Sequence, residues 1–309
     1  MAAIDCGTNS IRLLVADLPD PGAGAAAPLV EVSRRLETVR LGQGVDRTGR
    51  LAPEAIERTR VALAEYAAEI EKLGADRVRM CATSASRDAE NAAEFRDMVV
   101  RTLGVAPEVV TGEEEARLSF TGAVRGLPGS TREPYLVVDI GGGSTEFVVG
   151  TGTGGVAAAI SVDIGCVRMT ERHLHGDPPD PAEIRAAEVD IVAAVDRALD
   201  AVPGREAATL VGLAGSVTTV VAIAEGLTGY DPQRIHHARV SYRAVAEVTA
   251  DLLRATRAQR LAIPVMHPGR ADVIAAGALV LRVIMERAGK DSVVASEHDI
   301  LDGIGYSLR

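Results

Sequence analysis

The feature that most constrains the fold of this chain is a short pattern that occurs twice, near the start and near the middle. In each copy an aspartate ends an apolar segment of strand character, a glycine loop follows, and a second apolar strand begins. The copies align Asp5 with Asp139, Gly7 with Gly141, Ser10 with Ser144, and Leu14 and Val15 with Val148 and Val149. A repeated supersecondary unit of this kind predicts two domains of one ancestral type.

Strand segments and amphipathic helical segments follow each copy of the pattern, which predicts α/β domains. Residues 126–130 have the composition of a linker, so we expect domains at 1–127 and 128–309, with the last helix free to pack back on the first domain. The expected strands are 2–5, 11–18, 29 toward 41, 78–82, 107–110, 135–139, 145–150, 157–162 and 209–213. The expected helices are 53–73, 90–103, 113–124, 182–201, one opening at 214–219, 243–258, 271–287 and 299–308. A turn rich in Pro, Gly and Ala is expected at 19–28.

Composition excludes several classes of protein. The 309 residues are 47% hydrophobic and 25% charged, which is ordinary for a globular protein. No apolar run reaches the roughly 18 residues of a membrane span, and no signal-peptide pattern begins the chain, so the cytoplasm is the expected location. Three widely spaced cysteines argue against a disulfide framework. A net charge of −10 and an aromatic content of 3% disfavour nucleic acid as a partner.

Three loops that contain glycine and hydroxyl side chains each follow an apolar strand. Glycine allows backbone N–H groups to approach an anion closely, and hydroxyl groups add further donors. None of the loops is a Walker loop or a dinucleotide-binding GxGxxG motif. Each loop alone is compatible with an ordinary turn, but three together, two of them related by the repeat, indicate a phosphate cradle. The residues concerned are Thr8, Asn9, Ser10, Gly142, Gly143, Ser144, Thr145, Gly215 and Ser216.

Acidic residues bracket the second loop. Asp139 and Glu146 stand on either side of the glycine turn, so they can face one cavity from adjacent strands and hold a hard cation through oxygen. Asp5 can add a further, water-mediated ligand. The structural alternatives are a turn cap for Asp139 and a solvated strand position for Glu146.

Other charged residues have both a structural and a functional interpretation. The triplet 113–115 begins a predicted helix, where acidic side chains also favour the helix dipole. Arg12, Arg87 and Arg270 are candidate phosphate clamps, because a guanidinium group binds phosphate through two hydrogen bonds.

The histidines and one serine carry weaker signals. His173 with His175, and His236 with His237, are close in sequence, but no carboxylate accompanies them at metalloprotease spacing. Residues 296–299 have the composition of a hydrolase triad, although a serine that caps the last helix also explains them.

Four segments resemble the Ppx/GppA phosphatase family, which comprises exopolyphosphatases and guanosine pentaphosphate phosphohydrolases. In order along the chain they are DCGTNSIRL at 5–13, ATSASRDA at 82–89, GEEEARL at 112–118 and DIGGGSTE at 139–146. The resemblance implies two ribonuclease H-like domains around a central cleft, as in the superfamily of actin, sugar kinases and chaperone ATPases. It also implies the short, two-domain form of the family, without extra helical C-terminal domains.

The resemblance assigns roles to individual residues. Glu115, directly before the segment ARL, matches the catalytic base, and Asp139 and Glu146 match the metal-binding acids. Arg270 matches a phosphate-binding arginine. The third loop departs from the family, because it reads Ala214-Gly215-Ser216 where a Gly-Gly-Thr type of sequence is more usual.

The expected activity is hydrolysis of the terminal phosphoanhydride of inorganic polyphosphate, with release of orthophosphate. Glu115 is expected to activate the water, assisted by Mg²⁺, with Mn²⁺ as the alternative cation, in a homodimeric protein. One alternative activity is hydrolysis of guanosine pentaphosphate. A second is a sensor of low turnover that binds polyphosphate or guanosine penta- or tetraphosphate. A sugar or acid kinase is a third alternative, although no distinctive adenosine pocket is evident.

Overall fold

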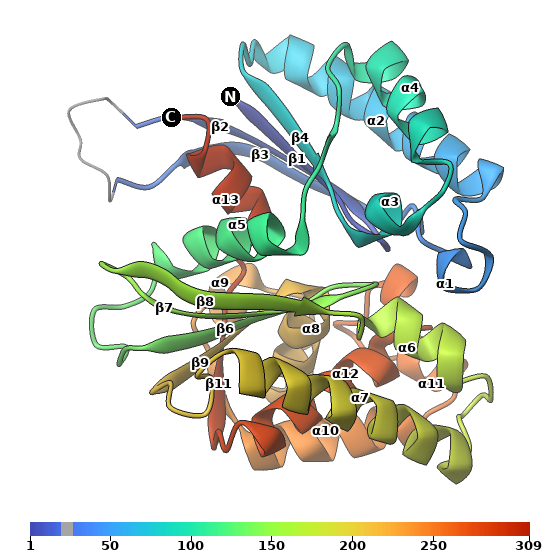
Figure 1. Cartoon of the computed structure of the whole chain (residues 1–309), viewed down its shortest axis with the longest axis vertical. Helices are drawn as coiled ribbons and strands as arrows, with labels where there is room; N and C mark the ends of the chain where they lie inside the picture. The colour runs from blue at the N-terminus through green and yellow to red at the C-terminus, as the bar shows by residue number, and fades with distance from the viewer. Residues whose placement is uncertain (20–26) are drawn as a thin grey trace. The chain divides into compact units, whose positions relative to one another are not determined.

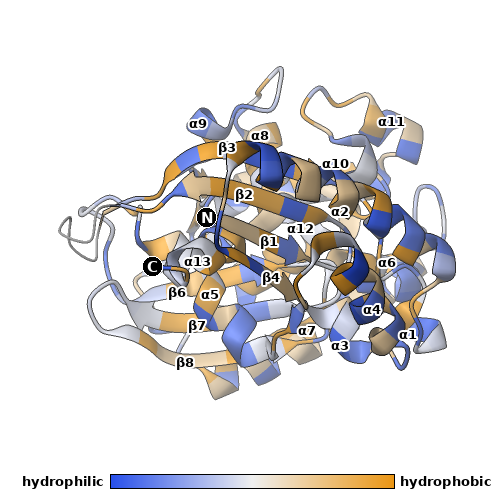
Figure 2. Cartoon of the chain, turned by 90° about the horizontal axis from the view of Figure 1, so that it is seen from above, coloured by the Kyte–Doolittle hydropathy of each residue, from blue (hydrophilic) through white to orange (hydrophobic). Residues whose placement is uncertain are grey.

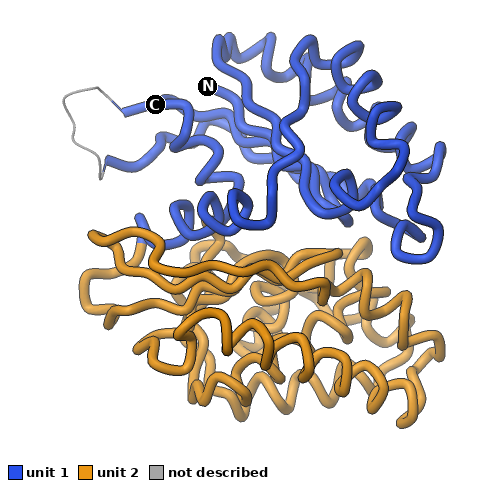
Figure 3. Tube along the Cα trace, in the orientation of Figure 1, with its two compact units in different colours: residues 1–126, 299–309 blue, residues 127–298 orange. Residues whose placement is uncertain are grey.

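The computed structural model describes residues 1–19 and 27–309 (Figure 1), so most of the turn expected at 19–28 lies outside the described residues. The chain forms two compact units (Figure 3). Unit 1 consists of Met1–Gly126 and Asp299–Arg309, and unit 2 of Leu127–His298. Each unit contains one mixed sheet with helices, so the prediction of two α/β domains is confirmed.

Unit 1 has a five-stranded sheet in the order β3-β2-β1-β4-β5. Strand β1 pairs antiparallel with β2 and parallel with β4, and β5 continues the parallel part. The third strand ends earlier than expected, because the Arg40 backbone is left-handed (φ 50°) and its N–H binds the carbonyl of Asn9. The strands are β1 (Ala2–Cys6), β2 (Ile11–Asp17), β3 (Val30–Glu37), β4 (Val78–Ala82) and β5 (Glu108–Val109).

Alternate residues of β1 point to two hydrophobic layers of unit 1, as the two-residue period of a strand requires. Ile4 packs with α2 and α4, whereas Ala3 packs with α5 and α13. Figure 2 shows β1 and β2 mostly in the hydrophobic colours, and α2 with hydrophobic and hydrophilic segments alternating. The helices are α1 (Val45–Thr48), α2 (Pro53–Leu73), α3 (Ser84–Asp88), α4 (Ala92–Leu103), α5 (Gly112–Val124) and α13 (Ile300–Tyr306).

Unit 2 repeats this sheet and adds one strand. Its order is β10-β11-β9-β6-β7-β8, in which β8-β7-β6-β9-β11 reproduces the order and the strand directions of unit 1. The shared topology supports the duplication inferred from the sequence. The strands are β6 (Tyr135–Ile140), β7 (Thr145–Thr151), β8 (Gly155–Val162), β9 (Thr209–Leu213), β10 (Arg239–Ser241) and β11 (Ser292–Ala295).

The helices of unit 2 pack around a core that includes Leu136, Val138 and Phe147 of the sheet. The helix expected at 243–258 is divided, because Thr256 and Gln259 form a capping box that begins a new helix. The helices are α6 (Cys166–His173), α7 (Pro181–Ala201), α8 (Ala214–Ala224), α9 (Pro232–Ile235), α10 (Tyr242–Arg254), α11 (Arg257–Leu261) and α12 (Ile274–Arg287), with a 3₁₀ turn at Pro268–Arg270. Within the described residues, no helix has the length and apolar character to cross a membrane.

The last helix begins differently from the sequence prediction. The carboxylate of Asp299, and not Ser296, caps α13 by accepting a hydrogen bond from the Leu301 amide at 3.0 Å. Ser296 instead donates its hydroxyl hydrogen to the His298 carbonyl at 2.7 Å. The serine-cap interpretation was therefore wrong, because a better acceptor stands directly before the helix.

Candidate active site

The candidate residues of unit 1 lie at one edge of its sheet. Strands β1, β4 and β5 are parallel, so the segments that follow them emerge at the same edge, where α/β proteins place their ligands. The first glycine loop follows β1, Arg87 lies in α3 after β4, and Glu115 lies in α5 after β5. The topology therefore brings together three segments that are far apart in the sequence.

The carbonyl groups of residues 8–10, in the first glycine loop, are bound inside unit 1. The Gly7 amide donates to the Ser10 carbonyl at 2.9 Å, and the Thr8 and Asn9 carbonyls accept from the amides of Gly42 and Arg40, both at 2.8 Å. Within 1–19 and 27–309, the amides of residues 8–10 donate no hydrogen bond. The amide N–H groups of the loop are therefore available to an anion, whereas its carbonyl oxygens are already hydrogen-bonded, as an anion site requires.

Of the acidic triplet at the start of α5, only Glu115 has a buried side chain. Its carboxylate accepts a hydrogen bond from Arg87 at 3.2 Å, and Arg87 also donates to the Val110 carbonyl at 2.9 Å. Glu113 is exposed and pairs with Arg117. The geometry separates Glu115 from its two neighbours, which the sequence pattern alone could not do.

Arg12 binds two aspartates of unit 1. It donates from Nε and Nη2 to the Oδ2 of Asp5 at 3.0 and 2.6 Å, and from Nη1 to the carboxylate of Asp299. Burial raises the pKa of Asp5, and attraction to Arg12 offsets only part of that effect. For Asp299, burial also opposes ionisation, but Arg12, the Leu301 amide and Arg34 together outweigh it and hold the pKa below its ordinary value. The expected role of Arg12 as a phosphate clamp stays a prediction.

The second glycine loop, in unit 2, has the same internal hydrogen bond as the first. The Gly141 amide donates to the Ser144 carbonyl at 3.1 Å, as Gly7 does to Ser10. The first turn of α6 lies against this loop, where the Cys166 amide binds the Gly141 carbonyl at 2.9 Å. This approach requires Gly165, since a Cβ atom there would lie 2.3 Å from the carbonyl carbon of Gly142.

Asp139 and Glu146 are direct strand partners in the β6–β7 hairpin. The equivalent positions of the β1–β2 hairpin hold Asp5 and Arg12. In unit 1 the two strand partners thus carry opposite charges, whereas in unit 2 both are carboxylates. Asp139 is 7% exposed and Glu146 is 1% exposed. Like charges directly opposite on a sheet are destabilising, and oxygen ligands suit Mg²⁺. The donor set of the second hairpin therefore fits a hard cation.

Two further observations concern metal sites. Asp5 Oδ1 is buried and, among the described residues, accepts no hydrogen bond.

The rings of His236 and His237 are 3.6 Å apart and His298 lies beside His236. Even so, no group of three His, Cys, Asp or Glu side chains in the described parts of the chain is arranged to hold a metal ion.

The third loop is built around Arg270. Its guanidinium donates to the Gly215 carbonyl at 3.3 Å and to Thr219 Oγ1 at 3.0 Å. A side chain at position 215 would meet the arginine, because a Cβ there would lie 2.2 Å from Arg270 Cζ. Ala214 has a left-handed backbone (φ 64°), which strains a residue with a side chain. The departure from the family therefore falls at a position suited to glycine.

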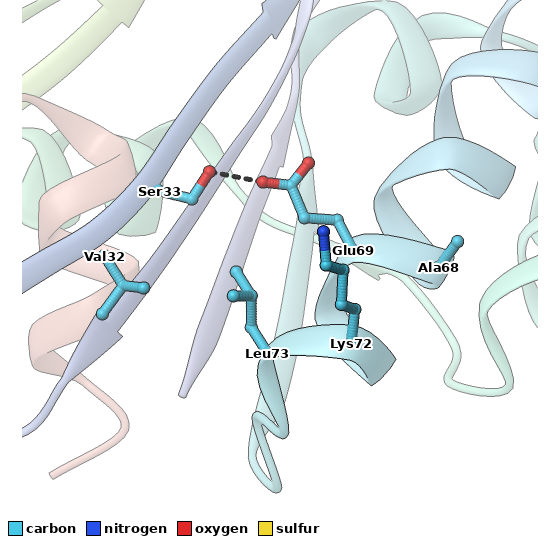
Figure 4. A pocket seen from close by; sticks show the side chains of 6 residues that line it. All are labelled: Val32, Ser33, Ala68, Glu69, Lys72 and Leu73. Carbon is cyan, nitrogen blue, oxygen red and sulfur yellow. Dashed lines mark hydrogen bonds between the residues drawn. The ribbon is translucent and has the colours of Figure 1, made fainter.

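A groove in unit 1 lies between β3 and α2 (Figure 4) and has a volume of about 520 Å³. It is lined by Val32, Ser33, Ala68, Glu69, Lys72 and Leu73. None of the predicted site residues lines it, so we do not assign the groove to the active site.

The sequence reasoning missed two groups that contact the candidate residues. Ser84 Oγ lies 2.8 Å from Thr8 Oγ1, and its place in the second family segment was the available signal. The Nε of Arg168 donates to the Gly143 carbonyl at 2.7 Å. No local sequence pattern marks Arg168, because two strands, β7 and β8, separate it in the sequence from the loop whose carbonyl it binds.

Comparison with known proteins identifies the class to which this fold and these loops belong. The sequence model of the Ppx/GppA phosphatase family matches residues 22–308. Exopolyphosphatase 2 of Mycobacterium tuberculosis (strain H37Rv) is 53% identical over 318 aligned residues, which cover 100% of this chain and 98% of that protein. The chain therefore belongs to the Ppx/GppA phosphatase family, and the resemblance inferred from the sequence is confirmed.

Two solved structures agree with this assignment. The crystal structure of an exopolyphosphatase-like protein has a TM-score of 0.92 and 45% identity, covering 98% of this chain and 96% of that one. The Aquifex aeolicus member of the family has a TM-score of 0.81 and 32% identity, covering 99% and 96%.

Replacing Arg12 by methionine should remove the guanidinium that is hydrogen-bonded to two buried carboxylates, and the loss of such a partner typically costs about 3–5 kcal/mol. In the parent, the lowered pKa of Asp299 contributes stability at neutral pH that is lost as the pH falls through that pKa. In R12M, without the attraction and hydrogen bonds from Arg12, the pKa values of both aspartates should be higher than in the parent. Folding of R12M should then take up protons. The difference in unfolding free energy between the parent and R12M should therefore become smaller as the pH falls from 7 toward 4. Urea unfolding across this range measures the effect.

The exposed arginine variant R60M, which breaks a surface pair with Glu57, should unfold as the parent does and serves as the control. An R12M protein that is as stable as the parent at pH 7, but binds substrate poorly, would instead favour the phosphate-clamp role.

Proposed function

We propose that this protein is an exopolyphosphatase, which hydrolyses the terminal phosphoanhydride of inorganic polyphosphate and releases orthophosphate. The observation that carries the proposal is the pair of glycine loops. The carbonyls of residues 8–10 and 141–144 accept hydrogen bonds within their own unit, while the amides of residues 8–10 and 142–144 donate none among the hydrogen bonds of the described residues. Support for the substrate comes from the relative named exopolyphosphatase 2, which matches the full length of the chain. Action in the cytoplasm as a homodimer is part of the same proposal.

The loops and two arginines would bind the phosphate groups. Phosphoryl transfer depends mainly on positioning and on neutralising charge. Arg87 and Arg270 each bind a backbone carbonyl of their own unit, which holds the guanidinium in a defined place. The other groups assigned to the substrate are Thr8, Asn9, Ser10, Arg12, Gly142, Gly143, Ser144, Thr145, Gly215 and Ser216.

Glu115 would act as the general base for the attacking water. Its side chain is largely buried, and the 3.2 Å hydrogen bond from Arg87 orients the carboxylate. A base that is held in one orientation loses less freedom when it meets the water than an exposed glutamate such as Glu113 would. The proton of the water would pass to the carboxylate of Glu115.

Asp139 and Glu146 would hold Mg²⁺, or Mn²⁺ as the alternative, and a water-mediated contribution from Asp5 stays a sequence prediction. Ser161 donates to Glu146 Oε1 at 2.7 Å, which fixes that carboxylate. When bound, the cation supplies positive charge against the phosphate oxygens. Asp139 and Glu146 would supply carboxylate oxygens as ligands, and the substrate and water would supply the remaining ones.

A panel of three substrates tests the proposed function. Phosphate release should be measured with polyphosphate, guanosine pentaphosphate and ATP in parallel under the same conditions. We expect the highest kcat/KM with polyphosphate. A preference for the pentaphosphate would replace the proposal with the alternative hydrolase, and tight binding of all three without turnover would indicate a sensor.

The change Glu115→Gln tests the base. Glutamine preserves size and hydrogen bonding but cannot accept the proton, and general-base catalysis typically contributes about 10²–10⁴-fold. We expect kcat to fall by that range while substrate affinity is largely retained. The matched control is Glu114→Gln on the same helical turn, which should remain close to the parent. If E114Q loses the activity and E115Q retains it, the role belongs to the neighbouring residue.

The variants Asp139→Asn and Glu146→Gln test a shared cation. Each should raise the Mg²⁺ concentration that gives half-maximal activity. The double variant should lose less activity than the product of the two single losses, because partners in one site are not independent. Titration of Mg²⁺ against phosphate release measures this. Independent losses with an unchanged Mg²⁺ requirement would exclude a common ion.

A further inference from the structure

We propose that Arg168 is a positioning residue that keeps the second glycine loop in its phosphate-binding conformation. This inference rests on the proposed function, because it assigns the loop to the substrate. Arg168 lies in α6 within unit 2, and its side chain is 12% exposed. Its Nε donates to the carbonyl of Gly143 at 2.7 Å.

The hydrogen bonds of the loop show what this contact does. The carbonyls of residues 141, 142 and 144 accept only from backbone amides in the hydrogen bonds that the structure describes. The Gly142 carbonyl, for example, accepts from the amides of Val167 and Arg168 at 2.9 and 3.1 Å. The Gly143 carbonyl is the one that depends on a side chain. A single substitution can therefore remove the donor of one peptide group in the loop.

The duplicated loop of unit 1 gives an internal comparison. The repeat aligns Asn9 with Gly143, and the Asn9 carbonyl accepts from the backbone amide of Arg40 at 2.8 Å. Both units thus bind the carbonyl at this position, but by different means. Because the carbonyl at this position is hydrogen-bonded in both units, we infer that the conformation of the loop depends on the orientation of this peptide group. The packing of α6 alone would not explain a donor in unit 1.

The peptide between Gly143 and Ser144 is the group at risk when Arg168 is removed. Glycine has wide backbone freedom, so an unanchored peptide at this position can rotate. Rotation would turn the Gly143 carbonyl toward the side on which phosphate is proposed to bind and would withdraw the Ser144 amide. An acceptor would then replace a donor, and an anion would be repelled where it had been bound.

The geometry distinguishes this role from a direct charge effect. A lysine keeps the positive charge but cannot reproduce the planar Nε–H of the guanidinium. If positioning is the role, R168K and R168M should lose function to similar extents. If the charge acts on the substrate, R168K should retain most of it.

The experiment compares R168K, R168M and the control R172M. Arg172 lies one turn later on α6 and pairs with Asp190 at 3.4 Å. Two quantities are measured, the kcat for polyphosphate and the affinity for inorganic phosphate by titration calorimetry. Both R168 variants should lose about 10- to 100-fold in each, the range expected for one hydrogen bond that involves a charged group. R172M should stay within threefold of the parent.

The two readouts separate this inference from the proposed function. If the parent does not hydrolyse polyphosphate, the proposed function fails, but weaker phosphate binding by both R168 variants still supports the positioning role. R168K within threefold of the parent, or unchanged phosphate affinity in R168M, would overturn it. Thermal unfolding by circular dichroism verifies folding, and R168K carries the test should R168M fail to fold.

Discussion

The pairing of β1 with β2, and of β6 with β7, sets the positions of the charged groups in both units. In each hairpin an aspartate near the end of the first strand lies opposite a charged residue at the start of the second. In unit 1 that residue is Arg12, and the pair is electrically satisfied through Asp5 and Asp299. In unit 2 it is Glu146, so two buried carboxylates, Asp139 and Glu146, are strand partners. A difference of one residue between duplicated hairpins thus turns a structural ion pair into a candidate cation site.

The loops between these strands follow a second shared rule. Backbone carbonyls that faced an anion would repel it, so an anion-binding loop has to bind them elsewhere. Unit 1 does this with backbone amides from the segment after β3, and unit 2 with the first turn of α6. The supporting segments are unrelated in sequence, although the loops that they support are alike. This difference explains why the repeat is evident in the loops and weak in the rest of the chain.

Local sequence patterns predicted the repeated hairpins and the long helices, because hydrophobic periodicity and glycine stops are local signals. The sequence analysis did not predict the short strands β10 and β11 or the helix α6, which span three, four and eight residues. It also could not show that Asp299 reaches Arg12 or that Arg168 reaches Gly143. Such contacts depend on the tertiary fold, and a charged side chain gives no local signal of its partner.

For the candidate site too, some features could be predicted from the sequence and others depend on the tertiary fold. Family segments and glycine loops nominated Glu115, Asp139 and Glu146, whose roles stay predictions, whereas the burial that separates Glu115 from its neighbours came only from the structure. Arg12 illustrates the converse case, since an isolated arginine near a phosphate loop suggests a clamp. Asp5 lies opposite Arg12 in the β1–β2 hairpin, but the second carboxylate partner, Asp299, could be seen only once α13 had been placed beside β1.

The central claim is that the amides of the two glycine loops bind phosphate. It is tested most directly by NMR titration of the ¹⁵N-labelled protein with inorganic phosphate in the presence of Mg²⁺. We expect saturable downfield amide shifts at residues 8–10 and 142–144, with smaller changes elsewhere. Shifts confined to other segments, or no saturable change in either loop, would contradict the claim.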